Sequence, residues 1–307
     1  MGTPDFAVGV LKEMVEASKN IVGVITAPDR PAGRGRKLMG SAVKEYALSQ
    51  NLKILQPTNL KDETFLKELK DLNANLQVVV AFRMLPKAVW QMPELGTFNL
   101  HASLLPQYRG AAPINWAIIN NEKKTGVTTF FIDEKIDTGS IISNKEVLIE
   151  ENETAETLHD KLMKKGSELV LETLILIENE NVTPKPQPEN NNLKDAPKLT
   201  PENTRIDWTK SGEDIDAFIR GLSPYPVAWS MLHNNKEELK TKIYAASFEK
   251  TNQDHEPGTI QTSKKDLKVA CLDGFIILKD LQLPGKRKMD IFSLLNGYSF
   301  DEDSKLS

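Results

Sequence analysis

The sequence has a single cysteine in 307 residues, which excludes an internal disulfide framework and a cysteine-rich zinc site. Aromatic residues are sparse at 7%, yet 39% of the residues are hydrophobic, enough to form buried cores. The longest apolar runs are short (VVVAF at 78–82, LILI at 174–177), so no transmembrane helix is expected. Charged residues among the first twenty argue against a secretory leader. These absences predict a cytoplasmic protein.

Positive charge is not in excess, because 39 Lys and Arg residues face 43 Asp and Glu residues. A net charge of −4 argues at first against nucleic acid, since Lys and Arg drive phosphate binding. The segment PDRPAGRGRKLMGS (28–41) nevertheless gathers four cations among glycines and prolines: Arg30, Arg34, Arg36 and Lys37. A ligand feels charge within a Debye length of about 8–10 Å, so a local cluster can bind phosphates whatever the total. We predict a mobile loop that contacts phosphate or nucleic acid; a solvated charge run is the alternative.

The first half of the chain alternates apolar, β-branched runs with amphipathic ones, which favours an α/β domain with a parallel sheet covered on both faces. The start, MGTPDFAVGVL, reads as a glycine-containing turn that leads into a helix. The strands that the pattern predicts are 21–27, 77–82, 97–103 and 127–132. The predicted helices are 43–50, 64–72, 113–120 and a long one that follows Thr154.

The composition changes between residues 182 and 205, a stretch with five prolines and four asparagines and little apolar content. Such a stretch is a semi-extended linker rather than a core element. A short helical segment (212–222) and several closely spaced strand-like runs follow, which predicts a small β-barrel that contains a buried Cys271. The expected organisation is a first domain over 1–183, a linker over 184–204 and a barrel domain over 205–307.

The segment GTFNLHASLLPQYRGAAPINW (96–116) is the densest in chemistry-bearing residues. Asn99 and His101 are two apart, so on a strand both side chains point to the same face. Histidine is suited to proton transfer near neutral pH, and a carboxamide can donate to an oxygen that becomes negative during acyl transfer. The alternative is a histidine that serves only structure.

A third polar group, Asp137, lies next to Gly139 in a predicted turn between two strands. Brought near His101, this carboxylate could orient the ring. The triplet Asp-Thr-Gly also occurs in aspartic proteases, but a pepsin-like enzyme needs a second triplet in an all-β chain, and a retroviral-type protease is a short all-β chain. Neither description fits this sequence.

With these residues in view, the chain resembles the methionyl-tRNA formyltransferase family along almost its whole length. The matching stretches are GTPDFAV, PDRPAGRGRKLM, VVVAF…LPKAV, NLHASLLPQYRGAAPINWAI, TGVTTFFIDEKIDTG, TRIDW (204–208) and SPYPVAW. The combination of the NLHASLLP block with Asp-Thr-Gly is specific to folate-dependent formyltransferases. The arginine-rich segment and the C-terminal domain favour the tRNA enzyme.

The resemblance implies a reaction in which 10-formyltetrahydrofolate donates its formyl group to the α-amino group of methionine on initiator tRNA, for initiation of translation. It implies a Rossmann-like N-terminal domain, an OB-type C-terminal barrel that assists tRNA binding, and no metal. The catalytic residues that it implies are Asn99, His101 and Asp137. The folate-binding residues that it implies are Phe82, Ser103, Leu104, Leu105 and Pro106. The tRNA-binding residues are those of the cationic segment, Arg30, Arg34, Arg36 and Lys37.

The sequence departs from the family pattern at two places, and each departure leads to a further expectation. The family has a β-strand before GTPDFAV, whereas this chain begins at the preceding methionine, so we expect the first strand of the sheet to be missing. A chain extended upstream by about ten residues should then unfold at a higher temperature, because unpaired strand edges are costly. The second departure is Phe82-Arg83-Met84, one residue shorter than the usual pattern, which leaves the pterin contacts open.

Other functions stay open at this point. The nearest is a formyltransferase that acts on a small amine such as glycinamide ribonucleotide or an amino-sugar nucleotide; such enzymes need neither the arginine-rich insertion nor the barrel. A non-catalytic nucleic-acid-binding protein is disfavoured by the three polar residues, and a nicotinamide oxidoreductase by the lack of GxGxxG after a strand. Two compact domains joined by one linker favour a monomer that has no membrane partner.

Overall fold

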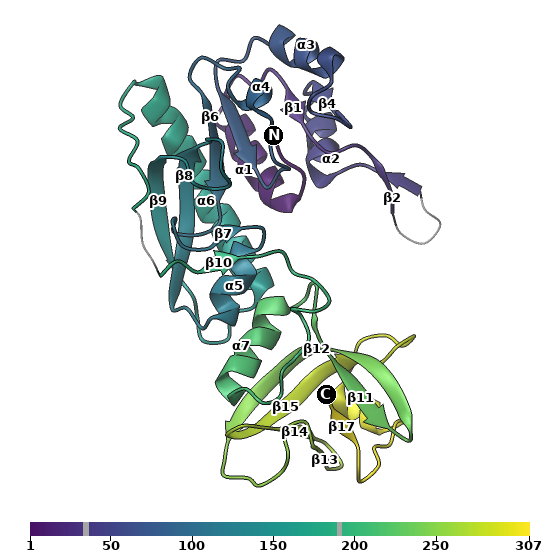
Figure 1. The fold of residues 1–307 in the computed structure, drawn as a ribbon. Coiled ribbons are helices and arrows are strands. Elements are labelled where there is room, and N and C mark those ends of the chain that lie inside the picture. The colour runs from purple at the N-terminus through teal and green to yellow at the C-terminus, as the bar shows by residue number, and fades with distance from the viewer. Residues whose placement is uncertain (33–36, 189–191) are drawn as a thin grey trace. The chain divides into compact units, whose positions relative to one another are not determined.

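The computed structural model describes residues 1–32, 37–188 and 192–307, which form two compact units (Figure 1). Unit 1 consists of residues 1–110, 125–148 and 159–195. Unit 2 consists of residues 111–124, 149–158 and 196–307. Segments of the first half of the chain therefore belong to each unit. Among the described residues, no helix combines the length and the apolar character that crossing a membrane requires.

The helices of unit 1 are α1 (Asp5–Glu16), α2 (Ala42–Ser49), α3 (Glu63–Asp71), α4 (Lys87–Trp90) and all but the first turn of α6 (Ala155–Glu178). Local signals set their starts. The Ser41 hydroxyl accepts a hydrogen bond from the Lys44 N–H at the start of α2, and the Asp62 carboxylate accepts one from the Phe65 N–H at the start of α3. The predicted helices of this unit are therefore confirmed within a few residues.

The strands of unit 1 are β1 (Val24–Ile25), β2 (Arg30–Ala32), β3 (Lys37–Met39), β4 (Ile54–Leu55), β5 (Gln77–Val80), β6 (Thr97–His101), β7 (Arg109–Gly110), β8 (Lys124–Phe131), β9 (Ile141–Leu148) and β10 (Asp195–Ala196). One residue of β8 and one of β10 belong to unit 2. The central sheet has the order β5-β6-β8-β9. Strand β6 pairs with β5 in parallel but with β8 in antiparallel fashion. The α/β class is confirmed, and the sheet is mixed where the sequence favoured parallel strands throughout.

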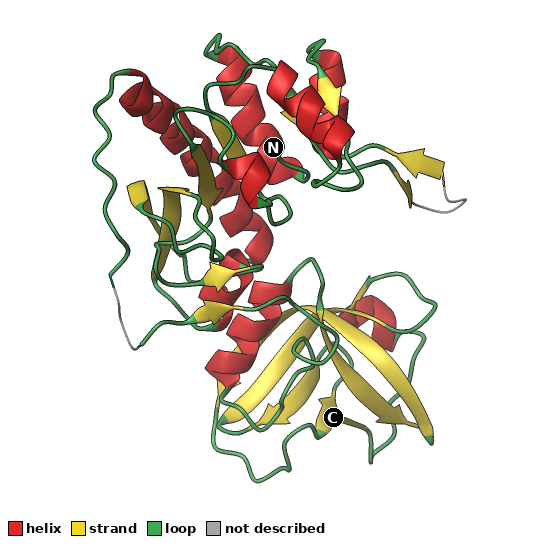
Figure 2. Cartoon of the chain, turned by 45° about the horizontal axis from the view of Figure 1, so that its top comes forward, coloured by secondary structure: helices red, strands yellow, loops and turns green. Residues whose placement is uncertain are grey.

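The cationic segment is more ordered than the sequence analysis expects. Strands β2 and β3 form an antiparallel hairpin, with Arg30 opposite Met39 and Ala32 opposite Lys37. Figure 2 shows this hairpin extending away from the helices of its own unit. The prediction of a loop throughout 28–41 was therefore wrong at both arms. Residues 33–36, and with them Arg34 and Arg36, lie outside the described part of the chain.

Strand β1 pairs in parallel with β4 and not with β5. The first two residues of the chain lie between β1 and β5. Gly2 forms a parallel bridge with Val80 of β5, and its N–H donates to the carbonyl oxygen of Ile25 in β1 at 3.0 Å. Gly2 thus bonds to both β5 and β1.

Unit 2 is built around an antiparallel barrel. Its strands are β11 (Ala228–Asn234), β12 (Glu237–Lys250), β13 (Ile260–Thr262), β14 (Leu267–Cys271), β15 (Gly274–Gln282), β16 (Met289–Asp290) and β17 (Lys305–Leu306). Its helices are α5 (Pro113–Ile119), α7 (Gly212–Leu222) and α8 (Ile291–Leu295). The strand order is β13-β14-β15-β12-β11-β17, and a bridge between Thr259 and Lys305 links the two ends of this order. The predicted barrel is confirmed, and Cys271 is fully buried in its core.

Candidate active site

The site forms where β5 and β6 of unit 1 end. The register pairs Asn99 of β6 with Val79 of β5 on one side and with Phe130 of β8 on the other. His101, two residues further on, is buried, and Asn99 is half-buried. Both side chains stand on the same face of β6, as the spacing predicts. Loops that leave the carboxyl ends of parallel strands are where ligands of such sheets bind.

Hydrogen bonding fixes the tautomer of His101. Its Nε2 lies 2.8 Å from the carbonyl oxygen of Tyr108. A carbonyl oxygen only accepts, so Nε2 carries a proton. In the neutral ring the lone pair is then on Nδ1, which faces Oδ2 of Asp137 at 3.7 Å. That distance is too long for a direct hydrogen bond, so Nδ1 is the nitrogen able to take up a proton, next to a carboxylate that stabilises the resulting cation.

Asp137 is held in place from two directions. Its Oδ2 accepts a hydrogen bond from the Gly110 N–H at 2.9 Å. Its backbone is in the left-handed region with φ 54°, a conformation that Asp tolerates better than most residues. The Gln187 side chain donates to the carbonyl oxygens of Asp137 and Gly139, both at 2.9 Å. The carboxylate therefore has a fixed position relative to the His101 ring.

Gln187 is a positioning residue that the sequence analysis missed. It lies in the proline-rich stretch interpreted as linker, and a lone glutamine there gives no signal of its own. The Arg109 guanidinium donates to the Gln187 side-chain oxygen from both Nε and Nη2. Residues 109 and 187 together thus hold the Asp137 turn.

Gly139 closes the turn in a place where no larger residue fits. A Cβ added there would lie 1.7 Å from the carbonyl oxygen of Phe131, which is backbone and cannot give way. The glycine of the Asp-Thr-Gly triplet is therefore required by the close approach of two backbone segments.

The side-chain oxygen of Asn99 is buried and, among the described residues, has no hydrogen-bond partner. An unsatisfied buried acceptor costs about 1–3 kcal/mol. Such groups in folded proteins call for an explanation, of which a catalytic role is one.

The loop that follows β6 is attached firmly to β8. The Ser103 hydroxyl donates to the Gln107 carbonyl oxygen at 2.6 Å, and the Thr128 hydroxyl donates to the Ser103 carbonyl oxygen at 2.7 Å. The Leu105 N–H donates back to the Thr128 hydroxyl at 3.2 Å. Ser103 and Leu105 are buried, and Leu104 and Pro106 are half-buried. This loop has a rigid backbone, as a binding loop needs.

Phe82 and Arg83 follow β5 at the same edge of the sheet. Phe82 packs against the apolar cluster that β5 shares with α3 and β1. The Arg83 guanidinium donates to the carbonyl oxygens of Pro57 and Thr58 and lies 5.7 Å from the centre of the Phe82 ring. Burial and the nearby Arg30 lower the pKa of Arg83. The unusual arginine thus ties the end of β5 to residues 57–58.

The predicted cationic residues that the structure describes lie on the hairpin. Arg30 is exposed on β2, and Lys37 begins β3. Asp29, the one acidic residue beside them in the sequence, accepts hydrogen bonds from the Gln56 amide and the Lys44 ammonium, and these contacts lower its pKa. Because Asp29 already pairs with Lys44, Asp29 does not neutralise the positive charge of the hairpin.

Comparison with known proteins assigns the family. The formyl transferase family model matches residues 1–174, and the model of the formyl transferase C-terminal domain matches residues 198–299. Methionyl-tRNA formyltransferase of Flavobacterium johnsoniae is 61% identical over 306 residues, which cover 100% of this chain and 97% of the relative. The chain belongs to the methionyl-tRNA formyltransferase family.

Two further comparisons are consistent with this family. The methionyl-tRNA formyltransferase of Flavobacterium psychrophilum is 58% identical over 98% of this chain and 96% of the relative. Among solved structures, an N-formyltransferase from Helicobacter canadensis in complex with folinic acid and dTDP-3-aminofucose has a TM-score of 0.63, with 23% identity over 90% of this chain and 96% of that one. At that identity the structural likeness supports the fold alone.

Proposed function

We propose that this chain transfers the formyl group of 10-formyltetrahydrofolate to the α-amino group of methionine carried by initiator tRNA. The observation that carries the proposal is the convergence of Asn99, His101 and Asp137 in a chain that matches methionyl-tRNA formyltransferases along its whole length. The three side chains are those that an acyl transfer to an amine requires.

In this reaction the methionine amine attacks the formyl carbon, and the carbonyl oxygen becomes an oxyanion. The Asn99 amide donates a hydrogen bond to that oxygen from Nδ2. A preorganised donor of this kind lowers the activation free energy by about 3 kcal/mol.

The reaction also moves one proton from the attacking nitrogen to the leaving N10 of the folate. His101 takes this proton on Nδ1 while its Nε2–H stays bonded to the Tyr108 carbonyl oxygen. Asp137 keeps the ring oriented and stabilises it while it is charged. Return of the proton to N10 releases tetrahydrofolate and restores the neutral ring. No metal is required, because the formyl group is already activated on nitrogen.

The folate co-substrate binds at the edge where β5 and β6 end. Phe82 lies on one side of this edge, and the loop of Ser103, Leu104, Leu105 and Pro106 lies on the other. Because Ser103 and Leu105 are buried and bonded within the protein, the loop contributes backbone groups and shape rather than free side chains.

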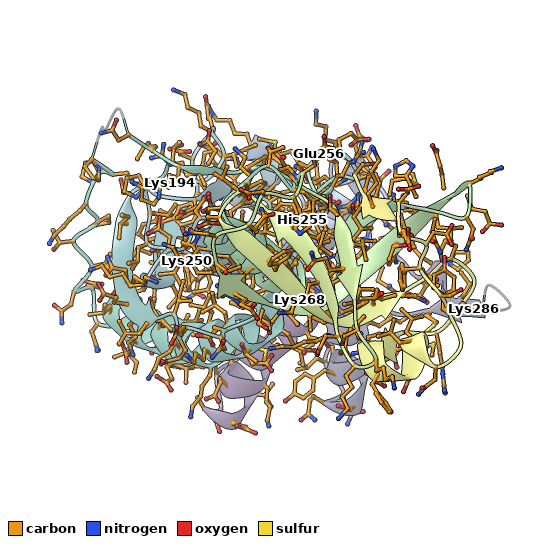
Figure 3. All side chains as sticks on the ribbon, turned by 90° about the horizontal axis from the view of Figure 1, so that it is seen from below. Lys194, Lys250, His255, Glu256, Lys268 and Lys286 are labelled. Atoms are coloured by element: carbon orange, nitrogen blue, oxygen red, sulfur yellow. The ribbon has the colours of Figure 1, made fainter. Side chains whose placement is uncertain are left out.

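The tRNA binds through phosphate contacts from Arg30, Arg34, Arg36 and Lys37. The barrel of unit 2 adds further cations, among which Lys250, Lys268 and Lys286 are labelled in Figure 3. Of these, Lys268 is paired with Glu249, whereas Lys286 is exposed. We further propose that the chain acts as a monomer in the cytoplasm.

Transfer of labelled formyl tests the proposal directly. Purified chain and labelled 10-formyltetrahydrofolate are incubated with charged initiator tRNA, with glycinamide ribonucleotide, or with an amino-sugar nucleotide. We expect label on the charged tRNA alone and none with uncharged tRNA. Label on a small amine but not on tRNA overturns the proposed substrate, and label on none of them overturns the proposed reaction.

A further inference from the structure

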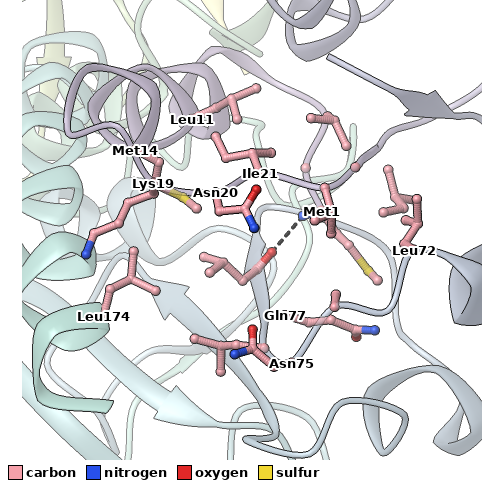
Figure 4. A pocket seen from close by; sticks show the side chains of 18 of the residues that line it. Met1, Leu11, Met14, Lys19, Asn20, Ile21, Leu72, Asn75, Gln77 and Leu174 are labelled. Carbon is pink, nitrogen blue, oxygen red and sulfur yellow. Dashed lines mark hydrogen bonds between the residues drawn. The ribbon is translucent and has the colours of Figure 1, made fainter. Parts of the chain in front are cut away.

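A cavity of about 520 Å³ lies beside Met1 in unit 1 (Figure 4), but the described residues that line it include none of the three proposed catalytic residues. Two of those three, His101 and Asp137, are held instead by hydrogen bonds that lead to one segment of the chain. That segment is the proline-rich stretch interpreted as a linker from its composition. Its residues 185–188 (the first arm) and 192–195 (the second arm) belong to unit 1.

The first arm runs beside the start of β9. Its Lys185 forms an antiparallel bridge with Ile141, and the two backbone N–H groups donate across this bridge at 2.8 and 2.9 Å. Every residue from 183 to 188 is exposed except Gln187, which is half-buried. Gln187 is thus the side chain that this arm directs toward the protein.

The Gln187 carboxamide uses all of its hydrogen-bonding capacity. A carboxamide has two N–H donors and an oxygen with two acceptor sites. Its nitrogen donates to the carbonyl oxygens of Asp137 and Gly139, and its oxygen accepts from Nε and Nη2 of Arg109. A side chain bonded at all four positions has one orientation, so it fixes the backbone that carries the Asp137 carboxylate opposite His101.

The second arm holds the other catalytic group, His101, through Gln107. The Gln107 side-chain oxygen accepts from the Lys194 N–H at 2.8 Å, and its nitrogen donates to the Asn192 carbonyl oxygen at 3.3 Å. The Lys194 carbonyl oxygen in turn accepts from the Tyr108 N–H at 2.6 Å. The carbonyl oxygen of Tyr108 is the acceptor for Nε2 of His101. A chain of three bonds therefore links the second arm to the imidazole ring.

Tyr108 needs this support because its backbone is in the left-handed region. Its φ is 59°, a value that a bulky residue rarely adopts. Residues in such conformations persist only where the surrounding structure holds them, and they are frequent at active sites. Here the second arm holds the Tyr108 N–H, and the Ser103 hydroxyl holds the preceding carbonyl, that of Gln107, at 2.6 Å. The carbonyl that faces His101 thus depends on the arm for its direction.

We propose that the two arms form a clamp that sets the separation between Nδ1 of His101 and Oδ2 of Asp137, with Gln187 and Gln107 as its positioning residues. This inference rests on the proposed function, because it concerns the geometry of the proposed proton transfer. A displacement of about 1 Å at a reacting group costs about 10²-fold in rate. Loss of one clamp side chain should therefore slow turnover and leave substrate affinity unchanged.

Two substitutions of Gln187 test the first arm. Gln187→Glu keeps the oxygen that Arg109 binds but sets a second oxygen against two carbonyl oxygens, which repel it. Gln187→Ala removes all four bonds and adds no charge. We expect kcat for formyl transfer to fall about 10–100-fold in both variants, with KM for folate and for tRNA within about twofold. The control is Gln50→Glu, an exposed glutamine at the end of α2. The kcat of the unmodified chain in either Gln187 variant overturns the proposal.

The Asp137→Asn background shows whether Gln187 acts through the carboxylate. A clamp that works by placing this carboxylate has nothing further to displace once it is gone. Gln187→Ala should therefore lower kcat by less than about twofold in that background. A side chain that only supports folding costs the same factor in both backgrounds, so an equal loss in both overturns the clamp.

Hydrogen exchange reports the first arm without any substrate. The Gly110 N–H donates to Oδ2 of Asp137, so its exchange rate depends on the position of the carboxylate. We expect this amide to exchange at least about tenfold faster in Gln187→Ala than in the unmodified chain. The Gly258 amide, which donates to the Ala270 carbonyl oxygen within the barrel, is the internal reference. Equal exchange at Gly110 in the two proteins overturns the positioning role of Gln187.

The second arm has its own test in Gln107→Ala, which removes both side-chain bonds to that arm. The Tyr108 amide should exchange at least about tenfold faster, and kcat should fall about tenfold. Exchange at Tyr108 or a kcat equal to that of the unmodified chain overturns the role of this arm. The exchange readouts do not depend on formyl transfer, so failure of the clamp is distinguishable from failure of the proposed function.

Discussion

Each of the two ring nitrogens of His101 faces a different oxygen atom. The Tyr108 carbonyl oxygen holds Nε2, and the Asp137 carboxylate faces Nδ1 at 3.7 Å. Removal of either side of this arrangement affects proton transfer more than folding, because the site adds little to the apolar core.

We expect His101→Ala and Asp137→Asn each to lower kcat by about 10²–10⁴-fold, the usual contribution of a general acid–base residue. Asp137→Asn keeps an oxygen that accepts from the Gly110 N–H, so its melting temperature should hardly change. The matched control is Asp133→Asn, whose carboxylate accepts hydrogen bonds from the Lys135 N–H and the Thr138 hydroxyl within the same turn. Turnover close to that of the unmodified chain in either site variant contradicts the assignment.

A substitution of Asn99 is expected to change activity and stability in different directions. Asn99→Ala removes both the donor to the oxyanion and the orphaned buried oxygen. We expect kcat to fall by about 10²–10³-fold, and the free energy of unfolding to stay equal or rise, since an unsatisfied acceptor is lost. Urea denaturation and single-turnover formyl transfer measure the two quantities. A variant that loses stability and keeps its activity points to a structural role.

The buried amino group of Met1 makes stability depend on pH. Its pKa is about 5 in the folded chain, against about 7.7–8.0 for an ordinary α-amino group. Between these values the unfolded chain binds the proton and the folded chain does not, so stability is lost as the pH falls from 8 to 5. The loss amounts to at most about 4 kcal/mol. Urea denaturation at pH 8 and pH 5.5 measures it, and acetylation of Met1 should remove this component. An identical pH dependence with and without acetylation argues against a buried amine.

At the level of elements, the turn between β8 and β9 positions the carboxylate. Gly139 approaches the Phe131 carbonyl so closely that a methyl group has no space, and Gln187 holds the turn from outside. The position of Asp137 thus depends on backbone packing as much as on its own contacts.

Gly139→Ala should therefore displace the turn and lower kcat by about 10²-fold, the cost of a misplacement near 1 Å. The control is Gly297→Ala, where an added methyl group meets nothing within 4 Å. Steady-state kinetics and thermal melting compare the two. If Gly139→Ala melts and turns over like the control, the turn does not position Asp137.

Much of the element pattern could be predicted from sequence, because apolar periodicity and capping residues act locally. The helix that follows Thr154 and the segment 212–222 formed as the pattern indicates. The antiparallel direction of β8 could not be predicted, since it depends on the path of the whole chain. The hairpin arms were missed because glycines and prolines dominate their composition. Asn99, His101 and Asp137 could be proposed from their residue types, and the structure places Asp137 near His101. Gln187 could not be proposed, because it acts through contacts with residues 48 to 50 positions away and has no local sequence signal.

At the scale of the whole molecule, positive charge is concentrated locally although the net charge is negative. The total is −4, yet the hairpin carries cations that Asp29 does not neutralise, because Lys44 already pairs with that carboxylate. A polyanion responds to this local field, which salt screens within about 8–10 Å.

Arg34→Ala should weaken the use of tRNA and leave folate binding unchanged. Loss of one phosphate contact reduces the slope of log K against log salt by about 1. Filter binding of tRNA over a salt series measures this slope, and Lys12→Ala, an exposed lysine of α1 paired with Glu16, is the control. An unchanged slope in Arg34→Ala means that Arg34 does not contact phosphate.

Unit 2 contains residues 111–124 and 149–158 in addition to the barrel, and within it the Asn115 side chain donates to the Gly221 carbonyl oxygen at 2.8 Å. A single protease cut in the proline-rich stretch 182–204 therefore does not yield two separable halves. The N-terminal fragment keeps α5, which packs on α7 of the C-terminal fragment within the same unit. The nicked chain should migrate as one particle under native conditions and as two bands once denatured.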